Sequence, residues 1–147
     1  MDRFALAKLD EWNKAESRKP LILMGARQVG KTWLMNAFAS KHYPHNTVSI
    51  NLMQNETLRT LFETINLEPK TILDAISIAT RQRIEPEKTL LVIDEIQESP
   101  RALTALKFFN EQMPELAVMV AGSLLGLALN RKKSSRRRPK LRLVGEQ

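Results

Sequence analysis

One glycine-containing stretch constrains the fold of this chain more than any other feature of its sequence. Residues 21–38 read LILMGARQVGKTWLMNAF, so a run of four apolar residues leads into a glycine, and a second glycine, a lysine and a threonine follow. This is the spacing of a phosphate-binding loop that joins a strand to a helix. The loop residues are Gly25, Ala26, Arg27, Gln28, Val29, Gly30, Lys31 and Thr32. The stretch therefore predicts a buried strand at 21–24 and a helix that begins at Lys31.

The glycines, the lysine and the threonine of this loop each have a physical reason to bind a polyphosphate. Glycine lets successive backbone N–H groups approach the phosphates closely, and the following helix directs the positive end of its dipole at them. Lys31 would contact the β- and γ-phosphates, and the Thr32 hydroxyl would ligate Mg²⁺. The alternative is a glycine-containing turn with an incidental lysine. The apolar strand and the amphipathic helix lie on the correct sides of the loop, which favours the phosphate site.

A second motif, LLVIDEIQ at 90–97, delivers two carboxylates to the end of an apolar strand. Asp94 is placed to hold Mg²⁺, and Glu95 to orient or deprotonate an attacking water. In isolation, such a pair is equally typical of a helix N-terminus with favourable acidic charge. Its position on a later parallel strand of a chain with a phosphate-binding loop favours the magnesium and catalytic roles.

The rest of the chain alternates between helical and strand-like patterns. Helical spacing of apolar residues predicts helices at 2–17, from 31 to just before 44, twice within 56–83 with a break near Pro69, and at 100–113. Apolar or β-branched runs predict further strands at 47–52, 89–94 and 116–122. Strands that alternate with helices form a parallel sheet with helices on both faces. The sequence therefore predicts an α/β fold.

Composition excludes several other classes of protein. The chain of 147 residues contains no cysteine, which rules out disulfides, thiolate metal sites and a cysteine nucleophile. It has no apolar run of the ~18 residues that a membrane-spanning helix needs. Its N-terminus, MDRFALAKLDEW, lacks the unbroken apolar region of a signal peptide. We therefore expect a cytoplasmic protein without membrane contact.

The net charge of +7 comes from the end of the chain alone. Residues 131–147, RKKSSRRRPKLRLVGEQ, hold eight Lys and Arg and one Glu, whereas residues 1–130 hold fifteen basic and fifteen acidic residues. A segment so rich in like charge cannot bury enough apolar surface to offset the entropy of ordering it, so we expect disorder there. We therefore predict two parts, a folded core at 1–130 and a basic tail at 131–147.

Four motifs together resemble a known family. GARQVGKT, LLVIDEIQ, the helix with ALKFF, and VAGSLLG are similar to those of AAA-type ATP-binding proteins of bacteria and archaea, whose ATPase core precedes a C-terminal domain of unknown function. The resemblance covers about residues 2–130. It implies a P-loop NTPase-like fold and Mg²⁺ as the cofactor. It also implies ATP rather than GTP, because no Asn-Lys-x-Asp motif is present.

The same resemblance assigns a role to Ser123, which follows the strand at 116–122. A polar residue there senses the γ-phosphate or positions water in such ATPases, whereas the alternative is a turn serine that caps a helix starting near Leu124. The family's sheet order would place the strand at 21–24 beside the strand that leads to Ser123, with the Asp94 strand next. AAA-type cores also often form rings, so self-association is an expectation from the family.

The chain departs from the family after Leu129. Family members continue with a fifth strand, which lies beyond the phosphate-loop strand, whereas this chain continues into its basic tail. Without that strand, the apolar strand at 21–24 would form an unprotected sheet edge and an aggregation hazard. Such ATPases also use an arginine from outside the core, and no residue here can be assigned to that role. We therefore predict a truncated core that binds nucleotide with weak or absent turnover.

Two alternatives to an ATP-binding core stay open at this point. The basic tail is also typical of a nucleic-acid-binding arm, although the charge-neutral body does not support that function. Otherwise the tail is a non-native product of a frameshift near codon 130 or of a broken gene, and the chain is a non-functional fragment. The abrupt change in charge balance favours a non-native origin of the tail, from a frameshift or a broken gene.

Overall fold

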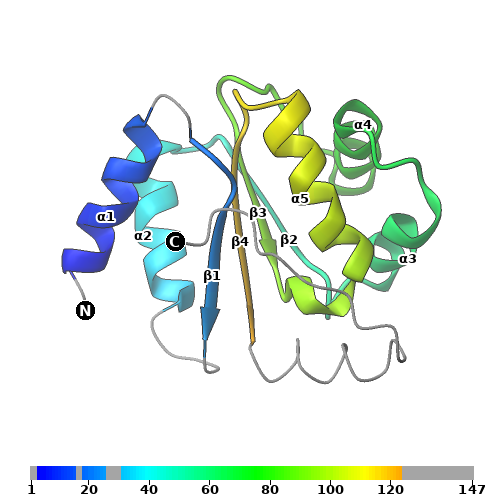
Figure 1. Ribbon diagram of the computed structural model, residues 1–147, viewed down its shortest axis with the longest axis horizontal. Coiled ribbons are helices and arrows are strands. Elements are labelled where there is room, and N and C mark those ends of the chain that lie inside the picture. The colour runs from blue at the N-terminus through cyan, green and yellow to red at the C-terminus, as the bar shows by residue number, and fades with distance from the viewer. Residues whose placement is uncertain (1–2, 16–17, 26–30, 124–147) are drawn as a thin grey trace.

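A four-stranded sheet lies at the centre of the structure, a computed structural model that describes residues 3–15, 18–25 and 31–123 (Figure 1). Its strands are β1 (Leu21–Gly25), β2 (Thr47–Asn51), β3 (Leu90–Asp94) and β4 (Ala117–Ser123). They pair in the order β1-β4-β3-β2, and every pairing is parallel. The predicted α/β fold with a parallel sheet is confirmed, and so is the predicted position of β1 beside β4 with β3 next.

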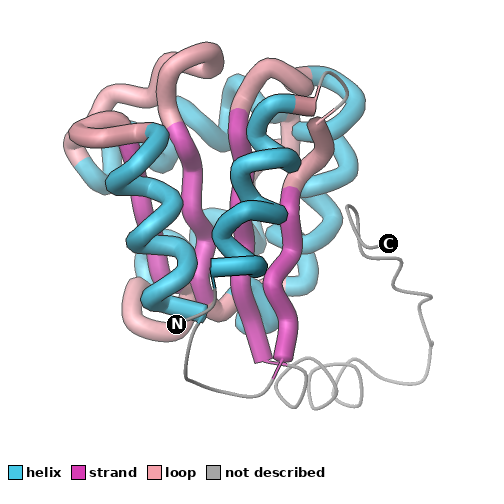
Figure 2. The backbone as a smooth tube through the Cα atoms, turned by 90° about the vertical axis from the view of Figure 1, so that its left-hand side faces the viewer, coloured by secondary structure: helices cyan, strands magenta, loops and turns pink. Residues whose placement is uncertain are grey.

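Helices cover both faces of this sheet, as the alternating pattern predicts. The described helices are α1 (Arg3–Lys14), α2 (Lys31–His42), α3 (Glu56–Thr64), α4 (Pro69–Thr80), α5 (Pro100–Gln112) and the short 3₁₀ helix η1 (Ile96–Glu98). Figure 1 shows α1 and α2 on one face and α3, α4 and α5 on the other, and Figure 2 shows the strands side by side behind the helices of the near face. The sequence patterns did not predict η1. None of the described helices has the length and apolar character to cross a membrane.

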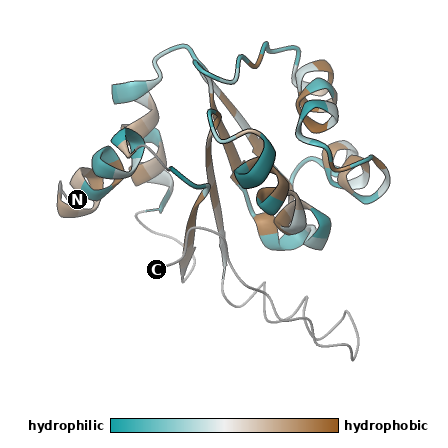
Figure 3. Cartoon of the chain, turned by 45° about the horizontal axis from the view of Figure 1, so that its top comes forward, coloured by the Kyte–Doolittle hydropathy of each residue, from teal (hydrophilic) through white to brown (hydrophobic). Residues whose placement is uncertain are grey.

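The central strands β3 and β4 supply side chains to both helical layers. Leu91, Ile93, Val118 and Val120 pack in the core under α3, α4 and α5, whereas Leu90, Val92, Ala117, Met119 and Ala121 pack in the core under α1 and α2. Successive residues of a strand point to opposite faces, so a strand covered on both faces must be apolar at every position. The apolar sheet is visible between the more polar outer helix surfaces in Figure 3. This double burial explains why LLVI and AVMV read as unbroken apolar runs.

Local capping fixes where the helices on the second face begin. The Asn55 side chain accepts a hydrogen bond from the Leu58 amide at 3.0 Å at the start of α3. The Ser99 hydroxyl accepts one from the Ala102 amide at 3.1 Å at the start of α5, where Pro100 occupies the first turn. Such caps satisfy backbone N–H groups that have no partner within the helix. α5 therefore begins at Pro100, with only Ser99 between it and η1.

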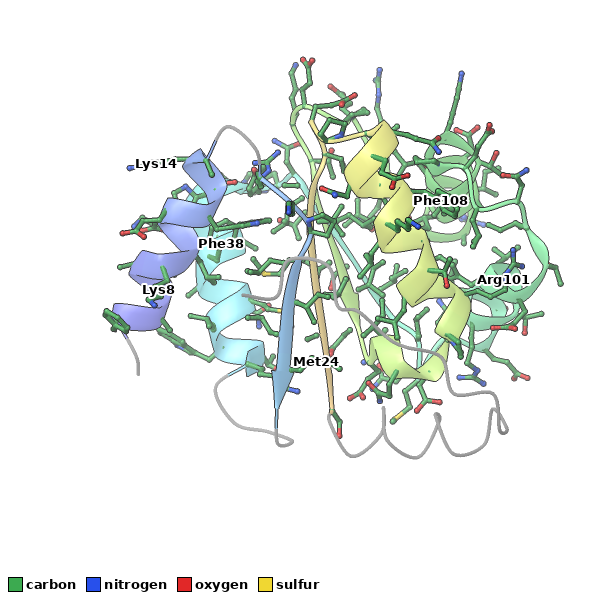
Figure 4. All side chains as sticks on the ribbon, in the orientation of Figure 1. Lys8, Lys14, Met24, Phe38, Arg101 and Phe108 are labelled. Atoms are coloured by element: carbon green, nitrogen blue, oxygen red, sulfur yellow. The ribbon has the colours of Figure 1, made fainter. Side chains whose placement is uncertain are left out.

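A charged cluster and an aromatic side chain join α1 to α2. The Asp10 carboxylate contacts Lys41 Nζ at 2.8 Å and His42 Nε2 at 2.7 Å. Phe38 of α2, labelled in Figure 4, is fully buried, and its ring lies 5.9 Å from the Trp12 ring of α1. The hydrogen bonds from Lys41 and His42 lower the pKa of Asp10 from its ordinary value of 3.8. Ionised Asp10 therefore stabilises the contact between α1 and α2.

We expect the Asp10→Asn variant to lose stability in a pH-dependent way. A carboxylate whose pKa is lowered in the folded state stabilises the fold above its ordinary pKa, 3.8 here, and this stabilisation is lost as pH falls through the lowered value. The variant should therefore have a lower Tm than the wild type at neutral pH, and the two should converge at acid pH. Thermal denaturation across this range, with the exposed Asp74→Asn as control, measures the effect. A Tm difference that stays constant with pH would contradict it.

Candidate functional site

The carboxyl ends of three neighbouring strands meet at one edge of the sheet. Gly25 ends β1, Ser123 ends β4 and Asp94 ends β3, and Gly25 and Ser123 are paired in register. The first turn of α2, with Lys31, lies at the same edge (Figure 1). In open parallel sheets, ligands bind outside the carboxyl ends of the strands. This edge is therefore the candidate site.

Lys31 reaches from α2 to the end of β4. Its ammonium group donates a hydrogen bond to the backbone carbonyl of Gly122 at 2.5 Å. The residue that would contact phosphates is therefore bonded to a neutral acceptor, one residue before Ser123. The site brings together Lys31 and Ser123, which lie far apart in the sequence.

Asp94 lies half-buried at the end of β3. Its Oδ1 atom accepts a hydrogen bond from the Glu95 amide at 2.8 Å. The pKa of Asp94 is raised above its ordinary value of 3.8, mainly by burial and to a smaller extent by the negative charge of Glu95. The hydrogen bond from the Glu95 amide and the positive charge of Lys31 lower the pKa, but they do not cancel the increase. The net increase means that the fold does not fully compensate the negative charge of Asp94. A cation at this position would do so.

Glu95 changes the direction of the chain between β3 and η1. Its backbone lies in the left-handed region, with φ 54° and ψ 47°, which residues other than glycine adopt rarely. Its Oε1 atom accepts a hydrogen bond from Gln97 Nε2 at 2.7 Å. The turn thus places the Glu95 carboxylate against the side chain of Gln97 in η1.

Gln97 is a site residue that the sequence patterns did not identify. Only 2% of its surface is exposed, and its Oε1 atom accepts a hydrogen bond from the Ser123 amide at 3.1 Å. Its other end binds Glu95. Gln97 therefore bridges the two predicted catalytic residues. The available signal was the glutamine of the DEIQ motif, whose contact with β4 no sequence spacing predicts.

Gly122 allows η1 to approach β4 this closely. A Cβ atom at this position would lie 2.7 Å from Gln97 Oε1 and 3.1 Å from Met24 Sδ, whose residue in β1 is labelled in Figure 4. Real Cβ atoms essentially never show contacts under 3.0 Å. A residue larger than glycine at this position would therefore force the end of the buried Gln97 side chain to shift.

The structure describes only part of the predicted site. It places Gly25, Lys31, Asp94, Glu95 and Ser123 at one edge, and it places Thr32 in the first turn of α2 with an exposed side chain. The remaining predicted loop residues, Ala26, Arg27, Gln28, Val29 and Gly30, lie outside the described residues, as do the helix expected near Leu124 and the basic tail. Within the described ranges, no three or more His, Cys, Asp or Glu residues form a group that could hold a metal ion.

A groove lies elsewhere, between α5 and the connection from α3 to α4. It has a volume of about 470 Å³ and is lined by residues 66–68 and by side chains of α5 that include Arg101 and Phe108 (Figure 4). Arg101 donates a hydrogen bond to the carbonyl of Ile65 at 3.1 Å, which ties α5 to that connection. None of the strand-end residues lines this groove, so it is separate from the candidate site.

The parallel sheet, the helix that begins at Lys31 and the acidic end of β3 define an α/β fold of the P-loop NTPase type. The sequence matches the family described as AAA domain over residues 17–144. Because this match covers most of the chain, the chain belongs to that family, and the resemblance to AAA-type ATPases is confirmed. The match extends into the basic tail. A search of curated proteins found no match to the chain.

We expect Asp94→Asn to stabilise the protein when nucleotide and metal are absent. A carboxylate whose pKa is raised by burial destabilises the fold as pH rises above its ordinary 3.8, and the effect is complete above the raised value. Asparagine keeps an oxygen that can accept from the Glu95 amide. Thermal denaturation with a chelator should therefore show a higher Tm for the variant at neutral pH, and a smaller difference at acid pH. A lower Tm at neutral pH would show that the charge is compensated.

We expect Gly122→Ala to destabilise the protein by about 1–3 kcal/mol, the usual cost of overpacking a filled site. The added methyl group would displace the buried Gln97 side chain, which lies 2.7 Å from the Cβ position. Urea denaturation measures the change in free energy of unfolding. An unchanged value would mean that Gln97 moves at no cost and that its hydrogen bonds do not contribute to stability.

Proposed function

We propose that this edge of the sheet binds ATP together with Mg²⁺, and that the same residues form the hydrolytic centre of an AAA-type ATPase core. Membership of the AAA domain family indicates nucleotide binding. The observation that carries the proposal is the position of Lys31, whose ammonium group lies at the ends of β1 and β4, next to Ser123. A cation at a helix N-terminus beside the carboxyl ends of parallel strands is suited to a polyphosphate.

Lys31 supplies the positive charge in this proposal. Its ammonium group is bonded to a neutral carbonyl, so breaking that bond does not leave a carboxylate unpaired. Hydrogen bonds between charged groups are stronger than those between a charge and a neutral group. Lys31 would therefore exchange the Gly122 carbonyl for the β- and γ-phosphate oxygens.

Asp94 and Thr32 would hold the magnesium ion. Mg²⁺ prefers oxygen ligands, keeps several waters, and takes only one or two carboxylates together with substrate phosphates. One half-buried carboxylate and one exposed hydroxyl fit that preference. The ion would neutralise charge on the phosphates when bound.

Glu95 and Ser123 would act on the attacking water and the γ-phosphate. The carboxylate of Glu95 is a candidate general base, and Gln97 connects it to the backbone of Ser123. Glu95 directly follows β3, Ser123 is the last residue of β4, and the two strands are neighbours in the sheet. Nothing in the described residues tests the expected weak turnover, which stays a prediction.

We expect Lys31→Ala to weaken binding of a fluorescent ATP analogue. A hydrogen bond to a charged group contributes about 1.5–3 kcal/mol, so Kd should rise roughly ten- to a hundredfold. Fluorescence anisotropy with Mg²⁺ measures Kd, and Lys107→Ala, at an exposed position of α5, is the matched control and should bind as the wild type does.

Two further measurements belong to this experiment. Asp94→Asn should remove the part of the affinity that depends on Mg²⁺, and unlabelled ATP should displace the analogue more effectively than GTP. Equal affinity of the wild type and Lys31→Ala would show that the assignment of the phosphate site is wrong.

A further inference from the structure

The side chain of Gln97 forms a bridge between two functional elements. It is buried, it donates to Glu95 Oε1 at 2.7 Å, and it accepts from the Ser123 amide at 3.1 Å. A buried amide costs free energy unless it is hydrogen-bonded. Burial and the two contacts together therefore hold the Gln97 side chain in a defined place.

These contacts also fix which end of the amide points where. The Glu95 carboxylate only accepts hydrogen bonds, and the Ser123 amide only donates. Turning the amide over would place its oxygen against a carboxylate and its NH₂ group against an N–H group. Both contacts would then be repulsive. Gln97 therefore has one favourable orientation, and that orientation holds the Glu95 carboxylate at a fixed place relative to β4.

The bridge continues to Lys31 through a single peptide group. Lys31 Nζ donates to the Gly122 carbonyl at 2.5 Å, and the Ser123 N–H donates to Gln97. The Gly122 carbonyl and the Ser123 N–H belong to the same planar peptide unit. A cation on the carbonyl polarises the unit and strengthens its N–H as a donor, because chains of hydrogen bonds reinforce one another. Lys31, the peptide, Gln97 and Glu95 thus form one connected series.

We propose that Gln97 is a positioning residue that holds the Glu95 carboxylate and couples its position to Lys31. When Lys31 turns from the Gly122 carbonyl to a phosphate, the Ser123 N–H becomes a weaker donor, and the hold of Gln97 on Glu95 weakens. The carboxylate is then free to turn toward a water. The role of the phosphate in this step rests on the proposed function. The hydrogen bonds that connect Gln97 to Glu95 and, through the Gly122–Ser123 peptide, to Lys31 do not.

The side-chain amide of Gln97 reports this coupling directly. In the ¹⁵N-labelled full chain, its NH₂ resonances are identified by their loss in Gln97→Glu. Glu95→Gln replaces a charged acceptor by a neutral one, so it should move these resonances upfield. Lys31→Ala should move them in the same direction without nucleotide, and Lys107→Ala should leave them in place. Resonances that respond to neither Glu95→Gln nor Lys31→Ala would overturn the proposal.

An exchange of the two side chains tests the pairing by stability. Gln97→Glu keeps an acceptor for the Ser123 amide but places a second carboxylate against Glu95, so Tm should fall. The double variant Glu95→Gln, Gln97→Glu restores a donor and an acceptor in reversed order, so Tm should recover most of the loss. Gln112→Glu, at an exposed position of α5, is the matched control. A double variant as unstable as Gln97→Glu, or one that fails to fold, would contradict the pairing.

Nucleotide binding separates this proposal from the proposed function. Addition of the ATP analogue with Mg²⁺ should shift the Gln97 resonances of the wild type in the direction seen for Lys31→Ala. If the wild type and Lys31→Ala bind the analogue equally, the assignment of the phosphate site is wrong. The chemical shifts of the Gln97 resonances in the nucleotide-free protein then still decide the role of Gln97. If the analogue binds at Lys31 and the Gln97 resonances do not move, the coupling is wrong and the phosphate site stands.

Discussion

The structure depends on β4, a strand that is bonded on both edges and buried on both faces. It pairs with β1 on one side and β3 on the other, and its side chains alternate between the two cores. A strand in this position must be apolar throughout and small where another element approaches. The end of β4 therefore holds the ends of β1 and β3 and the helix η1 close to one another.

The sequence predicted the elements well because the physical signal for each lies within a few residues. LLVI and AVMV are apolar at every position because both faces of these strands are covered, and Asp94 stands out as the first charge after such a run. The sheet order came from the family resemblance, since no residue pattern specifies which parallel strands are neighbours. The roles of Gln97 and Gly122 were out of reach because each depends on how η1 packs against β4, a contact between segments more than twenty residues apart.

The two outer strands of the described sheet differ in how their sequences suit an edge. Among the described residues, β2 pairs with β3 alone, and it alternates buried Val48 and Ile50 with exposed Ser49. β1 pairs with β4 alone within the same part of the chain, yet Leu21, Ile22, Leu23 and Met24 are all apolar and only partly buried. An apolar strand with an open edge is prone to pair with another strand. The composition of β1 is therefore closer to that of an inner strand than to that of a protected edge.

The three sequence motifs that looked separate form a single hydrogen-bonded unit at the end of β4. The lysine of GARQVGKT binds the carbonyl of the Gly122 peptide, the glutamine of DEIQ binds the N–H of the same peptide, and that glutamine also binds the glutamate of DEIQ. A side chain at Gly122 would push the glutamine away. The small residues of VAGS are thus as much a part of the candidate site as the charged ones, because they let one peptide group connect Lys31, which we propose binds phosphate, with Glu95, which we propose activates water.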